Sequence, residues 1–461
     1  MRSKSQKEMD SIVDWLSSTS ADMGLTQHTQ KKFSKIMNND EAFQVFIDAI
    51  LDPEMAKTSY ESLGAARSYR ALLALKEDMA TTSQGGTPIF MNPTRAGLLA
   101  KQVFASLEPP AKGILMHKRV LLDALLEAYP AAVVAAASAG GKDGLEEHLG
   151  PLMLFENCSQ TLPTLTSLVV YGCTGKNRRT STEHRPAASM PPQIVTKHNV
   201  ISHGHRRKFV RSLTEWNLLE RLAWWIVEED DNESPVGLGE EACETLLTIV
   251  ECVGYPHPDA DENEEEAGSV GEEMLLAPLG NEDYWEPLVS VLADPETQNE
   301  SARVAAARAI VGILGLATGK SPRIRRSAAP AVDETEDIEE PEVQPEENED
   351  EAMFNKLRDW GLTRKIHKAL IAHLPRIINA MTMDDHKFLD EDYQATIYIT
   401  AEGSRDKIPS TAVRHPGHCF VVPFTSWRLQ IAGMLAQLLS YEDGNDATDG
   451  KESPRAAAMS A

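Results

Sequence analysis

Apolar side chains recur along most of this chain at about 3.6 residues per repeat, the spacing of one face of an α-helix. Pro93 and Pro130 each precede such a segment, at a position where the first turn of a helix tolerates proline. Ser212 and Glu215 form the Ser-x-x-Glu pattern of a capping box, which predicts a helix start at Ser212. The periodicity predicts helices near residues 43–51, 59–79, 93–107, 118–129, 130–139, 145–155, 161–171, 218–226, 242–250, 284–293, 300–316, 353–360, 363–381 and 426–440.

These helices come in pairs with short links, and they do not alternate with strands. One strand is predicted, at 395–399. A helix pair is too small to bury its own apolar stripe, so neighbouring pairs must stack. The expected fold is therefore all-α, an armadillo/HEAT-like helical-repeat solenoid with a unit of about 40 residues, interrupted by disordered acidic insertions.

Changes in composition divide the chain into segments. The apolar periodicity disappears over 172–208, which is expected to be a mobile polar and basic loop. It disappears again over 321–352, an acidic stretch that is expected to be disordered. The expected organisation is an N-terminal, partly helical segment (1–40), a first helical-repeat half (41–171), the loop (172–208), a second helical-repeat half (209–320), the acidic insertion (321–352), C-terminal helical repeats (353–441) and a disordered tail (442–461).

The net charge of −25 narrows the choice of partners, because an acidic surface repels nucleic acid and anionic lipid and suits a basic protein. Much of this charge is local: 333–351 holds 12 acidic residues and no basic one. No apolar run approaches the roughly 18 residues of a membrane span. The five cysteines fit no disulfide framework, and Cys243 and Cys252 are expected to be small core residues. We expect a cytoplasmic protein, with the nucleus as a second location.

Candidate catalytic chemistry is sparse. His198, His203 and His205 could capture a metal ion, but no cysteine or carboxylate at ligand spacing accompanies them, so a polar loop is favoured. A second candidate cluster is formed by His415, His418 and Cys419, but the Pro-Gly pair at 416–417 between them indicates a turn, so a metal site is not favoured there either. Three glutamates at 240, 241 and 244 are expected on a solvated helix face. The chain is predicted to be no enzyme and to need no cofactor or metal, with a metal-dependent enzyme as the remaining alternative.

The order of three groups of motifs resembles the SAPS family, whose members are helical-repeat regulatory subunits of type-six serine/threonine protein phosphatases. The first group has Ala-Gly-Leu-Leu-Ala-Lys-Gln-Val-Phe at 96–104, His-Lys-Arg-Val at 117–120 and Leu-Glu-Glu-His-Leu at 145–149. The second has Trp-Asn-Leu-Leu-Glu-Arg-Leu at 216–222 and Glu-Ala-Cys-Glu-Thr-Leu at 241–246. The third has His-Leu-Pro-Arg-Ile at 373–377, Pro-Phe-Thr-Ser-Trp-Arg-Leu-Gln-Ile at 423–431 and Met-Leu-Ala-Gln-Leu-Leu at 434–439.

This resemblance implies a non-catalytic scaffold that binds and targets a phosphatase catalytic subunit. The alternative is an armadillo/HEAT-type adaptor for another protein, in trafficking or nuclear transport. In either case a surface must receive the partner, and exposed aromatic and arginine side chains suit that role. Of the neighbouring Trp224 and Trp225, the helical spacing assigns one to the core and leaves the other for a helix-pair seam or a binding surface. The predicted partner-binding residues are Trp216, Arg221, Trp224, Trp225, Pro423, Trp427 and Arg428.

Overall fold

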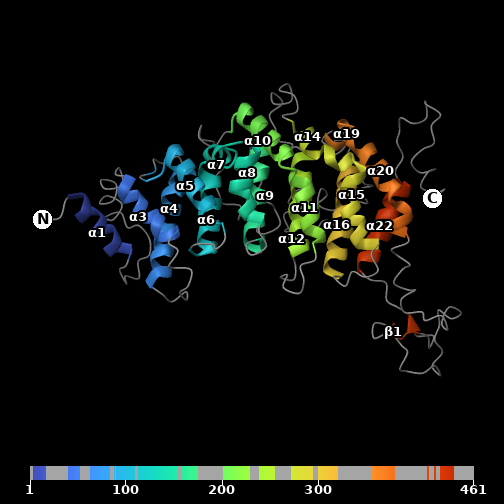
Figure 1. Ribbon diagram of the computed structural model, residues 1–461, viewed down its shortest axis with the longest axis horizontal. Helices are drawn as coiled ribbons and strands as arrows, with labels where there is room; N and C mark the ends of the chain where they lie inside the picture. The colour runs from blue at the N-terminus through green and yellow to red at the C-terminus, as the bar shows by residue number, and fades with distance from the viewer. Residues whose placement is uncertain are drawn as a thin grey trace, which may run out of the picture. The chain divides into compact units, whose positions relative to one another are not determined.

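The computed structural model describes residues 4–16, 40–51, 63–83, 88, 90–108, 113–153, 158–174, 201–228, 238–254, 271–293, 300–319, 356–378, 413–414, 420–421 and 426–440. These residues are mostly helical, so the all-α prediction is confirmed at this level (Figure 1). The extended residues among them are the two-residue strands β1 (Val413–Arg414) and β2 (Phe420–Val421), which pair antiparallel. The strand predicted at 395–399 lies outside the described residues.

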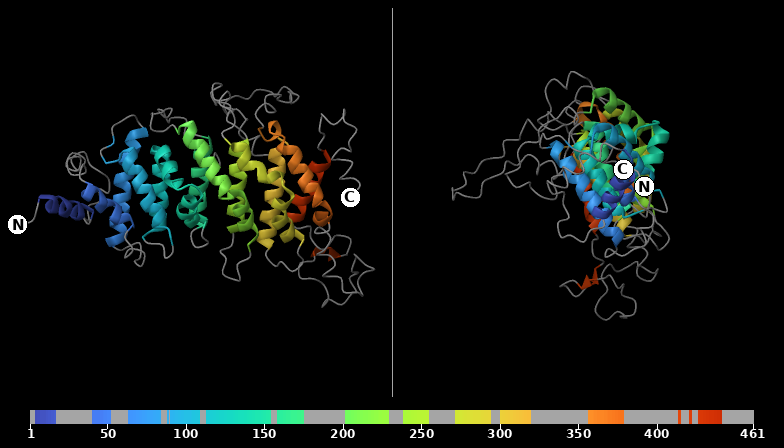
Figure 2. Two further views of the ribbon diagram at one scale, coloured as in Figure 1. Left: turned by 45° about the horizontal axis from the view of Figure 1, so that its top comes forward. Right: turned by 90° about the vertical axis from the view of Figure 1, so that its left-hand side faces the viewer.

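The chain forms two compact units. Unit 1 comprises Met1–Leu218 with Asp261–Leu275, and unit 2 comprises Leu219–Ala260 with Leu276–Ala461. In each unit, helices that are close in sequence lie side by side (Figures 1 and 2). No single described helix has both the length and the apolarity of a membrane span; the bent pair Leu115–Ala128 and Pro130–Ala137 meets both criteria only when taken together.

Unit 1 is built from helices that pack on their sequence neighbours. α3 packs on α4, α4 on α6, α5 on α7, and both α6 and α7 on α9. α10 then packs on α8 and α9. The elements are α1 (Lys4–Leu16), α3 (Asp40–Leu51), α4 (Leu63–Ser83), α5 (Pro93–Ala105), α6 (Leu115–Ala128), α7 (Pro130–Ala137), α8 (Lys142–Leu149), the 3-10 helix η2 (Gly150–Met153), α9 (Cys158–Thr174), α10 (His203–Glu215) and most of α14 (Glu272–Leu276).

Local chemistry explains several of these boundaries. Asn92 caps α5, because its side-chain oxygen accepts a hydrogen bond of 2.9 Å from the backbone N–H of Arg95. Pro93 then occupies the first turn, where a missing N–H costs nothing, and Pro130 does the same for α7. The starts predicted from these two prolines are confirmed.

Unit 2 is organised around α16, which packs on α12, α15, α20 and α22. Small residues allow this: Ala305, Ala306, Ala307 and Ala309 are all buried, on more than one side of the helix. Its predicted extent, 300–316, is confirmed within one residue. The elements are α11 (Leu218–Val227), α12 (Leu238–Gly254), the 3-10 helix η3 (Ala277–Gly280), α15 (Glu282–Ala293), α16 (Glu300–Ala317), α19 (Lys356–Asp359), α20 (Leu362–Ala372) and α22 (Ser426–Ser440), together with β1 and β2.

Two sequence predictions are wrong in the region of α10. The expected loop 172–208 includes the first turns of this helix, which begins at His203. Ser212 does not start a helix but lies inside α10, where its hydroxyl donates to the carbonyl of Lys208 at 3.0 Å. A serine hydroxyl that bonds four residues back satisfies itself within a helix, so the Ser-x-x-Glu pattern arises here without a cap. The helix is amphipathic, and the buried face includes Phe209 and Val210.

Candidate protein-interaction surface

Helix α11 has one face in the core of unit 2 and another on its surface. Its apolar residues follow the helical repeat closely enough to place one side of the helix in the core. The buried residues are Leu218, Leu219, Leu222, Ala223 and Ile226. Burial of this side fixes the helix and thereby fixes which residues face outward.

Four residues form the outward stripe at positions i, i+3, i+4 and i+7: Arg221, Trp224, Trp225 and Glu228. Trp224 is 51% exposed, and Trp225 is half-buried. The centroids of the two indole rings lie 5.6 Å apart with an interplanar angle of 76°, an edge-to-face arrangement. We call this pair the α11 aromatic face. This geometry does not identify either ring as a contact with a partner, but it shows that the large side chain of Trp224 is in contact with solvent.

The other predicted partner-binding residues lie elsewhere. Trp216 is fully buried in unit 1 at the C-terminal cap of α10, and its indole N–H donates to the carboxylate of Glu146 on α8 at 2.7 Å. Its ring is therefore part of the core, with no surface to offer in this structure. Arg221 is half-buried and interacts within the chain. Pro423 and the side chains of Trp427 and Arg428 lie outside what the structure describes.

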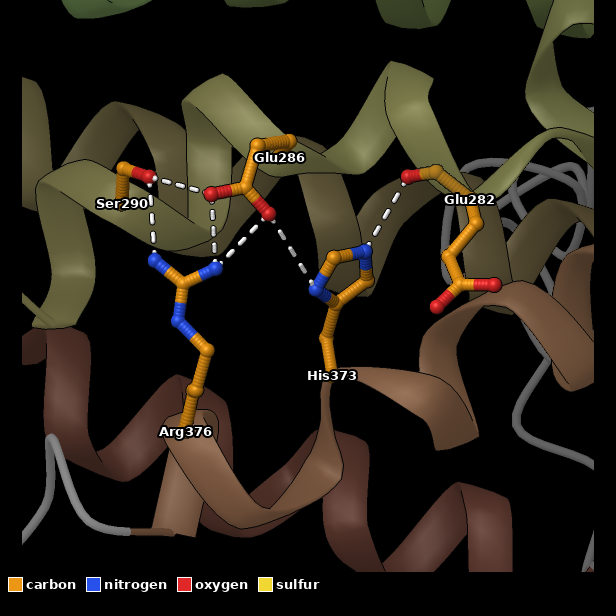
Figure 3. A network of polar contacts seen from close by, with 5 residues as sticks. All are labelled: Glu282, Glu286, Ser290, His373 and Arg376. Carbon is orange, nitrogen blue, oxygen red and sulfur yellow. Dashed lines mark hydrogen bonds and ion pairs between the residues drawn. The ribbon is translucent and has the colours of Figure 1, made fainter.

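Unit 2 also contains a network of polar side chains that joins α15 to the residues that follow α20 (Figure 3). Arg376 donates to both carboxylate oxygens of Glu286 at 2.7 Å, and to the hydroxyl of Ser290 at 3.1 Å. His373 lies beside the same carboxylate, with Nδ1 3.7 Å from Oε2, while its Nε2 is 3.0 Å from the backbone oxygen of Glu282. The network therefore connects elements that are about 90 residues apart in sequence.

Glu286 is the centre of this network. The hydrogen bond from Arg376 lowers the pKa of Glu286 below its usual value, and the hydroxyl of Ser290, which donates to Oε1 at 3.0 Å, acts in the same direction. A carboxylate with a lowered pKa, already paired with arginine, is a weak base. The arrangement suits an ion pair in which Nη1 of Arg376 donates to both oxygens of Glu286, and it does not suit activation of the serine hydroxyl.

The candidate metal ligands are not brought together in the described residues. His203 and His205 are exposed on the first turn of α10, and the ring Nδ1 of His205 lies 2.7 Å from the hydroxyl of Ser202. His198 and the second cluster, His415, His418 and Cys419, lie outside the described residues. More broadly, no group of three His, Cys, Asp or Glu that could hold a metal ion occurs in the described part of the chain.

The three glutamates of α12 behave differently from one another. Glu240 is exposed, as predicted for a solvated face, whereas Glu241 is half-buried. Glu244 accepts a hydrogen bond of 2.8 Å from Arg308 on α16, an ion pair that the helical pattern gives no means of finding. Cys243 and Cys252 are both buried, which confirms their prediction as core residues.

The described residues thus define an all-α protein of packed helices that presents an aromatic face on α11. Comparison of the chain with protein-family models, with curated proteins and with solved structures gives no match in any of the three.

Proposed function

We propose that this protein is a non-catalytic scaffold that binds another protein through the α11 aromatic face. The observation that carries the proposal is the exposed Trp224 on a helix whose opposite side is held in the core. Tryptophan is the residue most enriched among those that dominate binding energy, because one ring buries a large area with little loss of side-chain freedom. A rigid helix holds that ring in place before a partner arrives, which lowers the entropic cost of binding.

The proposal extends to an armadillo/HEAT-like repeat. The support is that many helices in each unit pack on near neighbours in sequence, as α3 with α4 and α15 with α16; α16 also packs on the distant α22. Such local packing is typical of arrays in which each helix pair buries its apolar stripe against the next. An array of this kind exposes one side of many helices, which suits a binding protein better than it suits a closed catalytic pocket.

The partner that we propose is a serine/threonine protein phosphatase catalytic subunit of the type-six kind, in the cytoplasm. The choice of this partner is supported by the order of the SAPS-like motifs along the chain. Many residues of these motifs are core residues, among them Leu99, Val103, Leu374 and Ile377. Core residues determine how helices pack, so the motifs bear on the fold more directly than on the partner. For this reason the partner needs an experiment of its own.

Affinity purification of the full chain from cells, followed by mass spectrometry, tests the proposal. We expect a phosphatase catalytic subunit in the bound fraction and expect Trp224→Ala to reduce its recovery about tenfold or more. Leu429→Ala is the matched control, since it also truncates an exposed apolar side chain of unit 2, 66% exposed on α22, and should leave recovery unchanged.

Two results would count against the proposal in different ways. Recovery of another protein in a Trp224-dependent manner would support the scaffold and favour the adaptor alternative over the phosphatase. Recovery that is equal for wild type, Trp224→Ala and Trp225→Ala would remove the α11 aromatic face from the account. Trp224→Ala should have a free energy of unfolding within about 0.5 kcal/mol of the wild type, because its side chain is exposed.

A further inference from the structure

We propose that the segment received by the α11 aromatic face is rich in arginine. This inference rests on the proposed function and adds the chemistry of the partner's contact segment. It follows from three observations: where the negative charge of the chain is concentrated, what surrounds the two tryptophans, and how the protein already holds an arginine in unit 1.

The negative charge of the chain is concentrated around α11. From residue 222 to residue 302 the sequence contains 23 Asp and Glu residues and no Lys or Arg. The chain as a whole has a net charge of −25, so the remaining 380 residues are close to neutral, at −2. This stretch begins inside α11, directly after Arg221. The helix that carries the aromatic face therefore opens a long acidic stretch that contains no basic residue.

Acidic side chains also lie at the C-terminal end of α11. Glu228 directly follows the helix, four residues after Trp224; it is half-exposed and has an interaction within the chain. A methyl group built on Gly239 would lie 3.1 Å from the carbonyl oxygen of Ile226, so the start of α12 is beside the last turn of α11. The next residue, Glu240, is exposed. The C-terminal end of a helix adds partial negative charge from its unpaired carbonyls.

An aromatic surface bordered by carboxylates is complementary to a guanidinium group. A cation is attracted to the face of an indole ring, and tryptophan gives the strongest such interaction. In the edge-to-face pair of Trp224 and Trp225, the edge of one ring meets the face of the other, and Trp224 is 51% exposed. Arginine suits this surface better than lysine, because its planar group can stack on a ring while its N–H groups donate to a carboxylate.

The same combination of ring and carboxylate already holds an arginine in unit 1. The guanidinium carbon of Arg95 lies 4.8 Å from the centroid of the Phe43 ring. Its Nη2 lies 2.6 Å from a carboxylate oxygen of Asp40. Arg95 thus shows, within this molecule, the kind of ring-and-carboxylate contact that we infer for a partner arginine at Trp224.

Binding of labelled peptides to the full chain tests the inference. The probe is a fluorescent peptide of alternating arginine and glycine, compared with lysine and glutamate counterparts of equal length. We expect the arginine peptide to bind most tightly, the glutamate peptide not at all, and the affinity to fall as salt is raised. Trp224→Ala and the double variant Glu228→Gln with Glu240→Gln should each raise the dissociation constant about threefold to tenfold.

Matched controls separate this surface from general attraction to an acidic protein. Asp283→Asn removes one exposed carboxylate from α15, and Leu429→Ala removes an exposed apolar side chain from α22. Both should leave the dissociation constant unchanged. Equal effects of Asp283→Asn and of the Glu228, Glu240 pair would overturn the inference, as would equal affinity of wild type and Trp224→Ala for the arginine peptide.

The chain's own basic segment, Arg323 to Arg326, is another possible occupant. If its deletion strengthens peptide binding severalfold, that segment already covers the face, and the assignment to a partner is overturned. The outcome can be told apart from failure of the proposed function. Trp224-dependent recovery of a partner, with no preference for arginine peptides, would retain the scaffold and reject only the chemistry of the segment.

Discussion

At the scale of single residues, several buried polar groups in unit 1 have partners far away in the sequence. The ring Nδ1 of His117 lies 2.7 Å from the hydroxyl of Ser68, and the indole N–H of Trp216 reaches Glu146. A buried polar group is tolerated when it is hydrogen-bonded. Removing one partner of a buried hydrogen bond leaves the other partner without a bond, which costs free energy. The helical pattern does not predict the burial of Trp216, because this residue lies just after α10 and is not part of the apolar stripe of that helix.

His117 should make stability depend on pH. Burial lowers its pKa from the usual value of 6.5, so the folded chain binds a proton less readily than the unfolded chain. Stability that is present above about pH 6.5 is therefore lost as the pH falls through and below that value. Between neutral and mildly acidic pH, we expect urea denaturation to show a smaller loss of unfolding free energy in His117→Asn than in the wild type. An equal loss in the variant would contradict the role assigned to His117.

Trp216 should contribute to the stability of unit 1 through its hydrogen bond to Glu146. Trp216→Phe removes the donor and leaves part of a fully buried site unfilled, so we expect the free energy of unfolding to fall by about 2 kcal/mol. Glu146→Gln keeps an oxygen acceptor and should cost less, about 0.5–1 kcal/mol. Denaturant titration measures both. If Trp216→Phe were as stable as the wild type, the indole would have no structural role, and the prediction that Trp216 contacts a partner would have to be reconsidered.

At the scale of elements, the sequence predicts helices well and their cross-helix contacts poorly. α16 was predicted within one residue, and α5 and α7 from their prolines, because apolar period and helix capping are local properties. α10 was missed at its start, since its first turns carry histidine and arginine and show no apolar period. Ion pairs such as Glu286 with Arg376 join residues far apart, and no local pattern can specify which helices meet.

The ion pair between Glu286 and Arg376 should stabilise the packing of the residues that follow α20 against α15 by a modest amount. A double-mutant cycle with Glu286→Ala and Arg376→Ala should give a coupling of about 0.5–1 kcal/mol at neutral pH, because both groups are about half exposed. Arg376 lowers the pKa of Glu286, so the coupling is present above its usual value of 4.5 and disappears as the pH falls through the lowered value.

The control for this cycle is Glu282→Ala, whose backbone oxygen accepts from His373 and remains after the substitution. It should show no coupling to Arg376→Ala. A coupling of the same size for Glu282 would mean that long-range charge interactions stabilise the packing here, and not the direct contact between Arg376 and Glu286 in Figure 3.

At the scale of the whole molecule, the account joins two features that the sequence shows separately. The apolar period supplies helices with one side in a core, and the charge is concentrated in the stretch that follows Arg221. Only the structure shows that Trp224 is the exposed ring of the two and that Trp216 is not at the surface. Which of the two neighbouring tryptophans is exposed depends on helices that pack from elsewhere in the chain.

Oxidative footprinting of the tryptophans tests the central claim most directly, because indole rings react readily when they are exposed to solvent. The chain would be oxidised alone and in complex with its co-purified partner, and each tryptophan quantified by mass spectrometry. The account predicts that Trp224 is oxidised readily in the free chain and protected in the complex, while buried Trp216 and Trp285 react little in either. Equal oxidation of Trp224 with and without the partner would contradict it.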